Sequence, residues 1–359
     1  MLGSETRAWG RFLPQPGDKT GCLAFASVHA RRRILVTGAG GYIGSALVKA
    51  IGDAGPRCIV LLDSSEHNLF EIQRHMEQAV GHAPHAAILG SAGDTDLLED
   101  IFTRFQPEIV YHAAAFKHVP LLELHPIAAV RNNAMGTWAL AKAAIRHGAT
   151  KFVLISTDKA VNPHSVMGVS KRIAELAVVA LSSAECRMSA IRLVNVIGSG
   201  GSVVPIFLKQ IAEGGPVTVT HPDASRWFLS QEETVEAVLA CVAADCDGRI
   251  LLPKVGEPRR ITELAEFLIR EAGKEIAIQF TGLRPGDKLT EELTYTTEVK
   301  DGFVEGGLEV VKTRRLGLAE VEGVMEQLSR CIAQRDIRGL IRTVSSVVPE
   351  YAMAKAAGV

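Results

Sequence analysis

The chain has 359 residues, of which 47% are hydrophobic and 22% are charged, and its formal net charge is −1. This length and composition predict a globular protein with a sizeable buried core. The balanced charge argues against a nucleic-acid partner and against a membrane-surface partner. There is no long uninterrupted apolar run, so we expect no membrane span. Six cysteines without paired short spacing favour reduced thiols and a cytoplasmic location.

Strands and helices alternate along the first half of the chain. Residues 1–30 lack periodicity and are expected to form a tail of uncertain order. From residue 31 to 198, short apolar runs typical of buried strands precede stretches typical of helices. This alternation predicts an α/β fold with a doubly wound parallel sheet. The expected strands span 34–37, 58–63, 85–89, 109–113, 152–156 and 189–195, and the expected helices span 45–51, 94–105, 128–147 and 168–181.

The rhythm changes after residue 198, where glycine and proline become frequent. Helices are expected at 203–213, 231–243, 261–272 and 319–334, with short strands between them. This region, 199–345, is predicted to form mostly a smaller substrate-binding lobe that is interleaved with the sheet domain. Residues 346–359 are expected to form a C-terminal tail.

A glycine-rich turn joins the first predicted strand to the first predicted helix. Gly38-x-x-Gly41-x-x-Gly44 provides the tight turn, and the helix that follows offers free N–H groups to a pyrophosphate. Asp63 ends the next strand, where a carboxylate accepts hydrogen bonds from the adenosine ribose and repels a 2′-phosphate. The pattern predicts a Rossmann dinucleotide site at residues 31–198 that prefers NAD over NADP. The expected cofactor residues are Gly38, Gly41, Tyr42, Ile43, Gly44, Asp63, Ser64, Ala113, Ala114, Ala115 and Lys171.

The spacing of this turn resembles that of the extended short-chain dehydrogenase/reductases. In that family an Asp after the third strand commonly caps the adenine, and here Ser91 replaces it. The family also places Ser or Thr at the end of the fifth strand and Tyr-x-x-x-Lys on the next helix, with both side chains on one helical face. Here Lys171 is present, but Met167 stands at the tyrosine position, and a thioether cannot act as acid or base.

Methionine at this position, with Asp-Lys after the fifth strand, resembles one branch of the UDP-N-acetylglucosamine 4,6-dehydratases, the CapD-like polysaccharide biosynthesis branch. The resemblance covers roughly residues 32–300. Its motifs are Leu62-Asp-Ser-Ser-Glu-His-Asn-Leu69, Ala113-Ala-Ala-Phe-Lys-His-Val-Pro120, Arg131-Asn-Asn133, Ser156-Thr-Asp-Lys-Ala-Val-Asn-Pro163, Asn195-Val-Ile-Gly-Ser-Gly-Gly-Ser-Val-Val-Pro205, Val217-Thr-Val-Thr-His-Pro-Asp223 and Leu283-Arg-Pro-Gly-Asp-Lys288.

The resemblance implies oxidation of sugar C4, removal of the C5 proton, loss of the C6 hydroxyl as water and return of the hydride to C6. We assign Lys159 as the C5 base and Asp158 as the C6 acid, while Thr157 should bond the C4 hydroxyl. Asp158, Thr157 or a water deprotonates that hydroxyl. Free lysine has a pKa of about 10.4. Burial or a cationic neighbour, such as Lys117 or Lys171, is therefore expected to lower the pKa of Lys159.

The substrate side is also assigned by resemblance. Arginines suit the pyrophosphate because their forked donors match phosphate oxygens. Thr218 and Thr220 lie where uridine is held, Asp287 or Glu292 would take the ribose hydroxyls, and Asn133 would brace the active-site strand. The expected substrate residues are Lys117, Asn133, Asn195, Val204, Thr218, Thr220, Arg226, Arg284, Asp287 and Glu292.

Other functions remain open. A UDP-hexosamine epimerase, acting at C4 or C5, is the alternative enzyme, and a scaffold that lost turnover through Met167 is a non-catalytic alternative. A simple C4 epimerase needs no C5 base, so Lys159 favours the dehydratase. The histidines lack the spacing of a zinc site, so no metal is expected. We expect a UDP-sugar substrate and a homo-oligomer.

Overall fold

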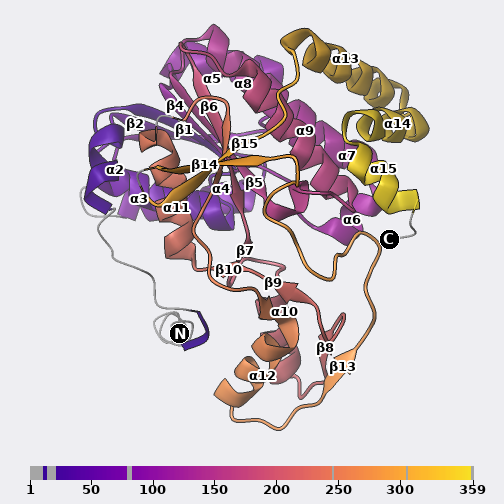
Figure 1. Ribbon diagram of the computed structural model, residues 1–359. Helices are drawn as coiled ribbons and strands as arrows, with labels where there is room; N and C mark the ends of the chain where they lie inside the picture. The colour runs from indigo at the N-terminus through magenta and orange to yellow at the C-terminus, as the bar shows by residue number, and fades with distance from the viewer. Residues whose placement is uncertain (1–10, 14–21, 79–82, 245, 305, 357–359) are drawn as a thin grey trace.

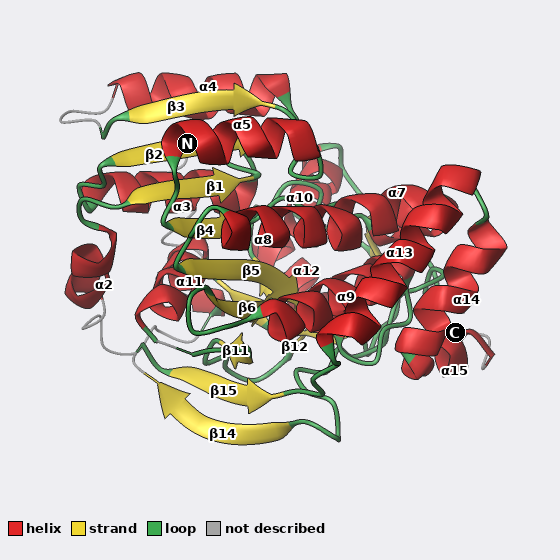
Figure 2. Cartoon of the chain, turned by 90° about the horizontal axis from the view of Figure 1, so that it is seen from above, coloured by secondary structure: helices red, strands yellow, loops and turns green. Residues whose placement is uncertain are grey.

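The computed structural model describes residues 11–13, 22–78, 83–244, 246–304 and 306–356. A sheet of nine strands crosses the molecule in the order β14-β15-β11-β6-β5-β4-β1-β2-β3, and Figure 2 shows these strands side by side. The strands from β11 to β3 pair in parallel, whereas β15 and β14 are antiparallel. The predicted doubly wound α/β class is therefore confirmed. The strands are β1 (Arg33–Thr37), β2 (Cys58–Asp63), β3 (His85–Leu89), β4 (Ile109–His112), β5 (Lys151–Thr157), β6 (Arg187–Leu193), β11 (Arg249–Leu252), β14 (Val299–Val304) and β15 (Leu308–Lys312).

Helices cover both faces of the sheet because apolar side chains alternate along each strand. Ile34 and Val36 join one core with α2, α3, α4 and α11, while Leu35 joins the other with α5, α8 and α9. The strand order reverses between β1 and β4, and ligands bind at such a reversal beyond the carboxyl ends of the strands. These helices are α2 (Cys22–His29), α3 (Tyr42–Asp53), α4 (Glu66–Gln78), α5 (Thr95–Phe105), α8 (Gly136–Arg146), α9 (Val166–Leu181) and α11 (Gln231–Ala243).

A smaller lobe extends from the sheet (lower part of Figure 1). Its core joins α10 (Val203–Ala212) and α12 (Ile261–Glu271) with the paired strands β8 (Val217–Val219) and β13 (Ile278–Phe280). The chain returns to the main sheet twice. Strand β11 joins it between β8 and α12, and β14 and β15 join it after β13. Two strand pairs link the parts: β7 (Asn195–Val196) with β10 (Phe228–Leu229), and β9 (Ser225–Arg226) with β12 (Arg259–Arg260).

Both expected tails include helices where the structure describes them. Helix α2 packs on α3 and α11 and buries Phe25, while Phe12 enters the core of the lobe. At the other end, α13 (Leu318–Gln334) and α14 (Ile337–Val347) pack on α9, and α15 (Pro349–Ala356) buries Tyr351. These short segments carry too little pattern of their own, because distant elements provide their apolar contacts. Residues 1–10 and 14–21 of the predicted N-terminal tail lie outside the described residues.

Two element boundaries also differ from the prediction. The single helix expected at 128–147 is divided into α7 (Pro126–Val130), a π-helical turn over Arg131–Met135, and α8. The wider turn presents Asn133 to the neighbouring loop, and such turns often occur at functional sites. The strand expected at 189–195 ends at Leu193, so Asn195 does not end it but begins β7. In the part of the chain that is described, no helix has the length and apolar character needed to cross a membrane.

Candidate active site

The glycine turn lies between β1 and α3 and leaves no room for side chains. Gly38 has φ +65°, and a Cβ there would stand 2.7 Å from the backbone nitrogen of Ala114. A Cβ at Gly44 would overlap the carbonyl oxygen of Gly38, and one at Gly40 would overlap the backbone of Asn68. The turn therefore requires glycine at Gly40 too, a position that the sequence motif did not single out. The result is a bare backbone surface at the start of a helix, which suits a pyrophosphate.

A cleft of about 240 Å³ opens beside this turn. The buried carboxylate of Asp63 accepts hydrogen bonds from the backbone nitrogens of Gly40 and Ser65, both at 2.9 Å. Each carboxylate oxygen keeps a second lone pair, so these bonds leave acceptors for ribose hydroxyls. The predicted cofactor residues that line the cleft are Gly38, Gly41, Asp63, Ser64, Ala113, Ala114 and Ala115, and Ser91 lines it as well.

Lys171 and the predicted cofactor residues of α3 do not line the cleft. The Tyr42 hydroxyl donates to the carbonyl oxygen of Ile197 at 2.7 Å, and Gln231 donates to the carbonyl of Tyr42. Ile43 packs against the core on the α3 face of the sheet. Tyr42 therefore ties the glycine turn to the segment after β7, and Ile43 anchors α3, so neither side chain serves as a cleft wall.

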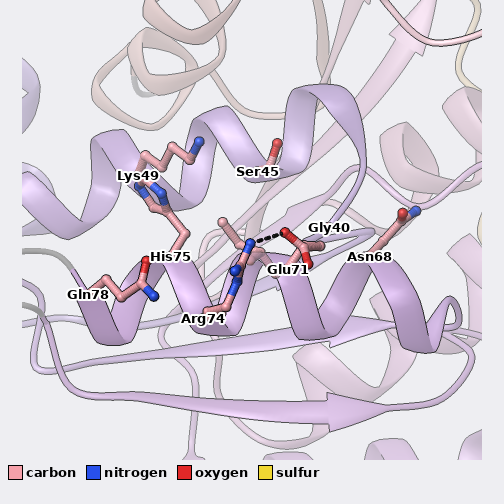
Figure 3. Close-up of a pocket in the computed structure, with 9 residues that line it drawn as sticks. Gly40, Ser45, Lys49, Asn68, Glu71, Arg74, His75 and Gln78 are labelled. Carbon is pink, nitrogen blue, oxygen red and sulfur yellow. Dashed lines mark hydrogen bonds and ion pairs between the residues drawn. The ribbon is translucent and has the colours of Figure 1, made fainter.

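A second groove, of about 270 Å³, lies between α3 and α4 on the far side of the glycine turn (Figure 3). Glu71 and Arg74 form an ion pair there at 2.8 Å, beside Lys49 and His75. Burial, followed by the charge of Lys49, lowers the pKa of His75. We place the candidate active site at the cleft beside Asp63, because most of the predicted cofactor residues line it and because β5, which leads into the predicted catalytic segment, pairs with β4, whose following residues Ala113–Ala115 form its wall.

The predicted catalytic residues follow β5 as one short 3-10 turn. Thr157 caps the turn, and its hydroxyl donates to Asp158 Oδ1 at 2.9 Å. Lys159 Nζ donates to the same oxygen at 2.9 Å and to Asn195 Oδ1 at 3.1 Å. Asp158 is fully buried, whereas the Lys159 side chain keeps 25% of its surface exposed. Lys159 and Thr157 are therefore accessible, whereas the Asp158 carboxylate lies behind them.

The surroundings of Lys159 differ from those expected. Glu291 Oε1 lies 3.6 Å from Lys159 Nζ, so the neighbour is a carboxylate that the sequence did not suggest. Burial alone would lower the pKa of Lys159, but the charges of Asp158 and Glu291 outweigh it and raise the pKa above its ordinary value. The prediction of a lowered pKa, with Lys117 or Lys171 as the cause, is thus wrong for this structure, in which Lys159 is a paired ammonium.

Met167 and Lys171 lie at the start of α9. The Met167 thioether is buried among apolar side chains of α7, α9 and the C-terminal helices, and it is the backbone carbonyl that accepts a side-chain hydrogen bond, from Ser170. Lys171 Nζ donates to the carbonyl oxygen of Ile155 in β5 at 2.7 Å. Burial, opposed by the charge of Glu175, lowers the pKa of Lys171 to about 8. The helix thus delivers its lysine to the active-site strand as the i, i+4 spacing requires.

Asn133 braces a loop of the cleft. Its side chain accepts from the backbone nitrogen of Phe116 at 2.8 Å and donates to the Phe116 carbonyl and to Ser170 Oγ, both at 3.0 Å. These bonds fix the segment that carries Phe116, a wall of the cleft, and the adjacent exposed Lys117. Asn133 was expected to brace the active-site strand, but its side chain bonds the loop after β4 and Ser170 of α9, and it is fully buried.

The predicted substrate residues lie in different surroundings. Arg226 is largely engaged, since its guanidinium donates to the carbonyls of Ser225, Lys288 and Leu289. Arg284, 57% exposed, pairs with Asp287 at 2.9 Å. Thr218 bonds Gln210, and Glu292 accepts from Asn162. Val204 is buried in the lobe core, so its side chain packs rather than binds, and Thr220 is half-buried at the end of β8.

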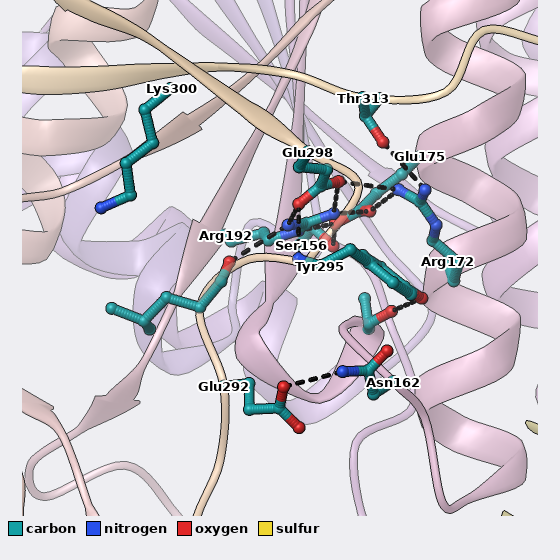
Figure 4. A network of polar contacts seen from close by, with 12 residues as sticks. Ser156, Asn162, Arg172, Glu175, Arg192, Glu292, Tyr295, Glu298, Lys300 and Thr313 are labelled. Carbon is teal, nitrogen blue, oxygen red and sulfur yellow. Dashed lines mark hydrogen bonds and ion pairs between the residues drawn. The ribbon is translucent and has the colours of Figure 1, made fainter. Parts of the chain in front are cut away.

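A buried ionic network behind the catalytic turn was missed (Figure 4). Arg192 bonds Glu175 through two nitrogens at 2.9 Å and Glu298 at 2.6 and 2.8 Å. Glu175 also accepts from Ser156, the residue before Thr157. Burial is opposed by the charge of Arg192, and the pKa of Glu175 falls to about 2. No sequence motif indicates this network, because Arg192 is 17 positions from Glu175 and 106 positions from Glu298. No cluster of metal-ligating side chains occurs within the described ranges.

Comparisons with known proteins identify a family and several relatives of this chain. A family model described as "Polysaccharide biosynthesis protein" matches residues 34–309. The capsular polysaccharide biosynthesis protein CapD of Staphylococcus aureus is 40% identical over 303 residues, which are 83% of this chain and 51% of CapD. The probable polysaccharide biosynthesis protein EpsC of Bacillus subtilis (strain 168) is 42% identical over 273 residues, which are 75% of this chain and 46% of EpsC. The chain thus spans about half the length of these two relatives.

A UDP-glucose 4-epimerase of Rickettsia typhi is 30% identical over 284 residues, covering 77% of this chain and 81% of that enzyme. Among solved structures, Pen from Bacillus thuringiensis has a TM-score of 0.72 at 24% identity and covers 83% of this chain and 98% of its own. DesIV, a dTDP-glucose 4,6-dehydratase from Streptomyces venezuelae with NAD and TYD bound, has a TM-score of 0.65 at 22% identity, covering 73% of this chain and 88% of DesIV. The structural likenesses establish the expected extended short-chain dehydrogenase/reductase fold, and the family match over residues 34–309 shows that this chain belongs to the polysaccharide biosynthesis protein family.

Proposed function

We propose that this chain catalyses the NAD-dependent 4,6-dehydration of a UDP-linked amino sugar, with UDP-N-acetylglucosamine as the substrate. The observation that carries the proposal is the hydrogen-bonded set of Thr157, Asp158 and Lys159 at the end of β5, the strand next to β4, whose following residues line the dinucleotide cleft. A base with an exposed amine is what removal of a C5 proton requires. The buried thioether of Met167 leaves this set as the acid–base group of the site.

The cleft fits a dinucleotide. Its glycine turn would be blocked by a Cβ at Gly38 or Gly44, and Asp63 presents free lone pairs to a ribose. Bound NAD would supply the acceptor and later the donor of the hydride exchanged with the sugar. Asp63 favours NAD, since a 2′-phosphate beside this carboxylate would be repelled.

The side chains divide the proton transfers. The C4 hydroxyl proton passes to Thr157 Oγ1, whose own proton moves along the existing hydrogen bond to Asp158. Lys159 Nζ, as the neutral amine, removes the C5 proton and delivers a proton to the departing C6 hydroxyl, which leaves as water. Asp158 then returns its proton to Lys159 across their hydrogen bond, and Lys159 protonates C5. The C4 proton thus balances the one lost with water, and Asp158 serves as a buried relay rather than as the direct C6 acid.

The test is incubation of the purified chain with UDP-N-acetylglucosamine, with and without added NAD, followed by mass spectrometry. We expect a product lighter by one water, without net formation of reduced cofactor. The Lys159→Met variant should form this product about 10²–10⁴-fold more slowly, whereas Lys300→Met, a change on the exposed strand β14, should behave as the parent. A parent that yields no dehydrated product would refute the proposal.

A UDP-hexosamine epimerase is the second candidate, because the epimerase of Rickettsia typhi is matched over 81% of its length. The same experiment separates the two, since epimerisation leaves the mass unchanged and produces a new stereoisomer. A C4 epimerase would also tolerate loss of the C5 base, so turnover by Lys159→Met would favour it.

A further inference from the structure

Residues 288–298 form a strap across the catalytic turn, and the strap is fixed on both sides of Glu291. Lys288 Nζ donates to the carbonyl oxygen of Val161 at 2.6 Å, and the Tyr295 hydroxyl donates to that of Ala160 at 2.7 Å. Arg192, at the centre of the network in Figure 4, donates to the carbonyl of Leu293 at 3.1 Å. The strap therefore holds its side chains against the turn in a fixed position, as a reacting site requires.

Glu291 is the strap residue that points at Lys159. Its side chain is 3% exposed, and Oε1 lies 3.6 Å from Lys159 Nζ and 3.7 Å from Arg226 Nε. Oε2 lies 3.5 Å from Lys288 Nζ, as an ion pair without good hydrogen-bond geometry. A buried carboxylate oxygen in this state calls for an explanation, and a catalytic role is one explanation.

The proposed dehydration requires a second carboxylate near Lys159 to hold its proton. Lys159 must be a neutral amine when it attacks C5, yet it is held here as an ammonium. Its proton has to be kept within reach while the sugar reacts. Among the described residues, two carboxylates lie within ion-pair distance of Nζ, namely Asp158 Oδ1 at 2.9 Å and Glu291 Oε1 at 3.6 Å. Asp158 is already occupied, because it receives the C4 hydroxyl proton through Thr157.

We propose that Glu291 takes the proton of Lys159 before C5 is attacked, holds it during turnover and returns it when the product leaves. This inference rests on the proposed dehydratase function. The step breaks one N–H bond of the ammonium and forms one O–H bond on the carboxylate, so the pair keeps its total charge. Glu291 then touches the base rather than the sugar, and it is a positioning residue.

Arg226 makes the transfer depend on substrate. Burial favours the protonated form of Glu291, but the charges of Lys159, Arg226 and Lys288 lower its pKa in the free protein. If the Arg226 guanidinium turns to a diphosphate, Glu291 loses a cationic neighbour and binds a proton more tightly. The charged groups that face the Lys159–Glu291 pair are thus Asp158 from the catalytic turn, Arg226 from β9 and Lys288 from the strap.

The experiment compares Glu291→Gln with Glu213→Gln, a change at an exposed carboxylate after α10. C4 oxidation is measured as cofactor reduction in a single turnover. C5 deprotonation is measured as deuterium incorporation from heavy water. We expect Glu291→Gln to oxidise C4 as the parent does but to exchange C5 and lose water about 10- to 100-fold more slowly, the range of acid–base catalysis. Glu213→Gln should match the parent in both steps.

The pH dependence provides a readout that a purely structural defect would not produce. In Glu291→Gln, Lys159 has to lose its proton to solvent, so kcat should rise steeply with pH and approach that of the parent in alkaline buffer. Glu291→Asp, which keeps a carboxylate, should recover part of the activity at neutral pH. Parent-like kcat in Glu291→Gln, or equal loss of C4 oxidation and C5 exchange, would overturn the inference. A parent without dehydratase activity would instead refute the proposed function.

Discussion

The cofactor cleft and the catalytic turn are built in different ways. In the cleft, Asp63 bonds Gly40 across 23 positions of sequence, and the glycine turn is held by backbone packing. Around the catalytic turn, Lys288 reaches Val161 across 127 positions and Tyr295 reaches Ala160 across 135. The carboxylate and the glycine turn of the first region come from one β-α-β segment, although Ala113–Ala115 complete its wall. The second depends on ionic side chains that only the folded chain brings together, so mutations should affect the two regions differently.

The largest effect should come from Lys159→Met. Removal of the amine abolishes the C5 base, and we expect kcat for water loss to fall by about 10²–10⁴-fold, the usual contribution of an acid–base group. NAD binding should be retained, because the cleft beside Asp63 does not use this side chain. Mass spectrometry of the product and NAD titration measure the two properties, and loss of NAD binding would show that the regions are not separate.

Glu175→Gln tests the buried network. Breaking one partner of a buried ion pair leaves Arg192 and Arg172 with Glu298 as their one remaining carboxylate in the network and should cost roughly 3–5 kcal/mol of unfolding free energy. The pKa of Glu175 is about 2 when folded, below its unfolded value of about 4.3. Its stabilisation is therefore present above about pH 4.3 and is lost as the pH falls toward 2. Urea unfolding between these limits should show a weaker acid dependence in the variant, with exposed Glu185→Gln as the control.

Gly44→Ala tests the cleft by sterics alone. The added Cβ meets the carbonyl of Gly38, so the turn must shift at a cost of about 1–3 kcal/mol, as for other overpacked sites. NAD affinity should fall with it. Gly323→Ala on α13 has open space around its Cβ and should leave stability unchanged or raise it. Thermal unfolding and NAD titration report the outcome, and parent-like values in Gly44→Ala would contradict this geometry.

The smallest effect should come from Asp63→Asn. Loss of the negative charge removes the repulsion of a 2′-phosphate, worth roughly 1–2 kcal/mol at a partly solvated site. The ratio of NADP to NAD affinity should rise about tenfold, since 1.36 kcal/mol is a factor of ten. Asp53→Asn, at the exposed end of α3, serves as the control. An unchanged ratio would mean that Asp63 does not face the ribose.

Much of the architecture was predictable because short-range patterns of apolar residues indicate the helices and strands. The six strands from β1 to β6 and the helices α10, α11, α12 and α13 lie where the apolar periodicity placed them, within a few residues at each end. Thr157, Asp158 and Lys159 form one hydrogen-bonded set, and adjacency in sequence made that foreseeable. The π-helical turn at Arg131–Met135 was not foreseeable, because hydrogen bonds to a distant loop accompany it.

The sequence by itself determined the strands β1 to β6, the glycine turn, the acidic residue at Asp63 and the adjacency of Thr157, Asp158 and Lys159, since each depends on residues close together in the chain. Only the tertiary structure decided the charge state of Lys159. Glu291 lies 132 positions away, and its carboxylate, with that of Asp158, overcomes the effect of burial on the ammonium. The physical reason is that electrostatic interactions in a buried site depend on distance through space, which sequence separation does not report.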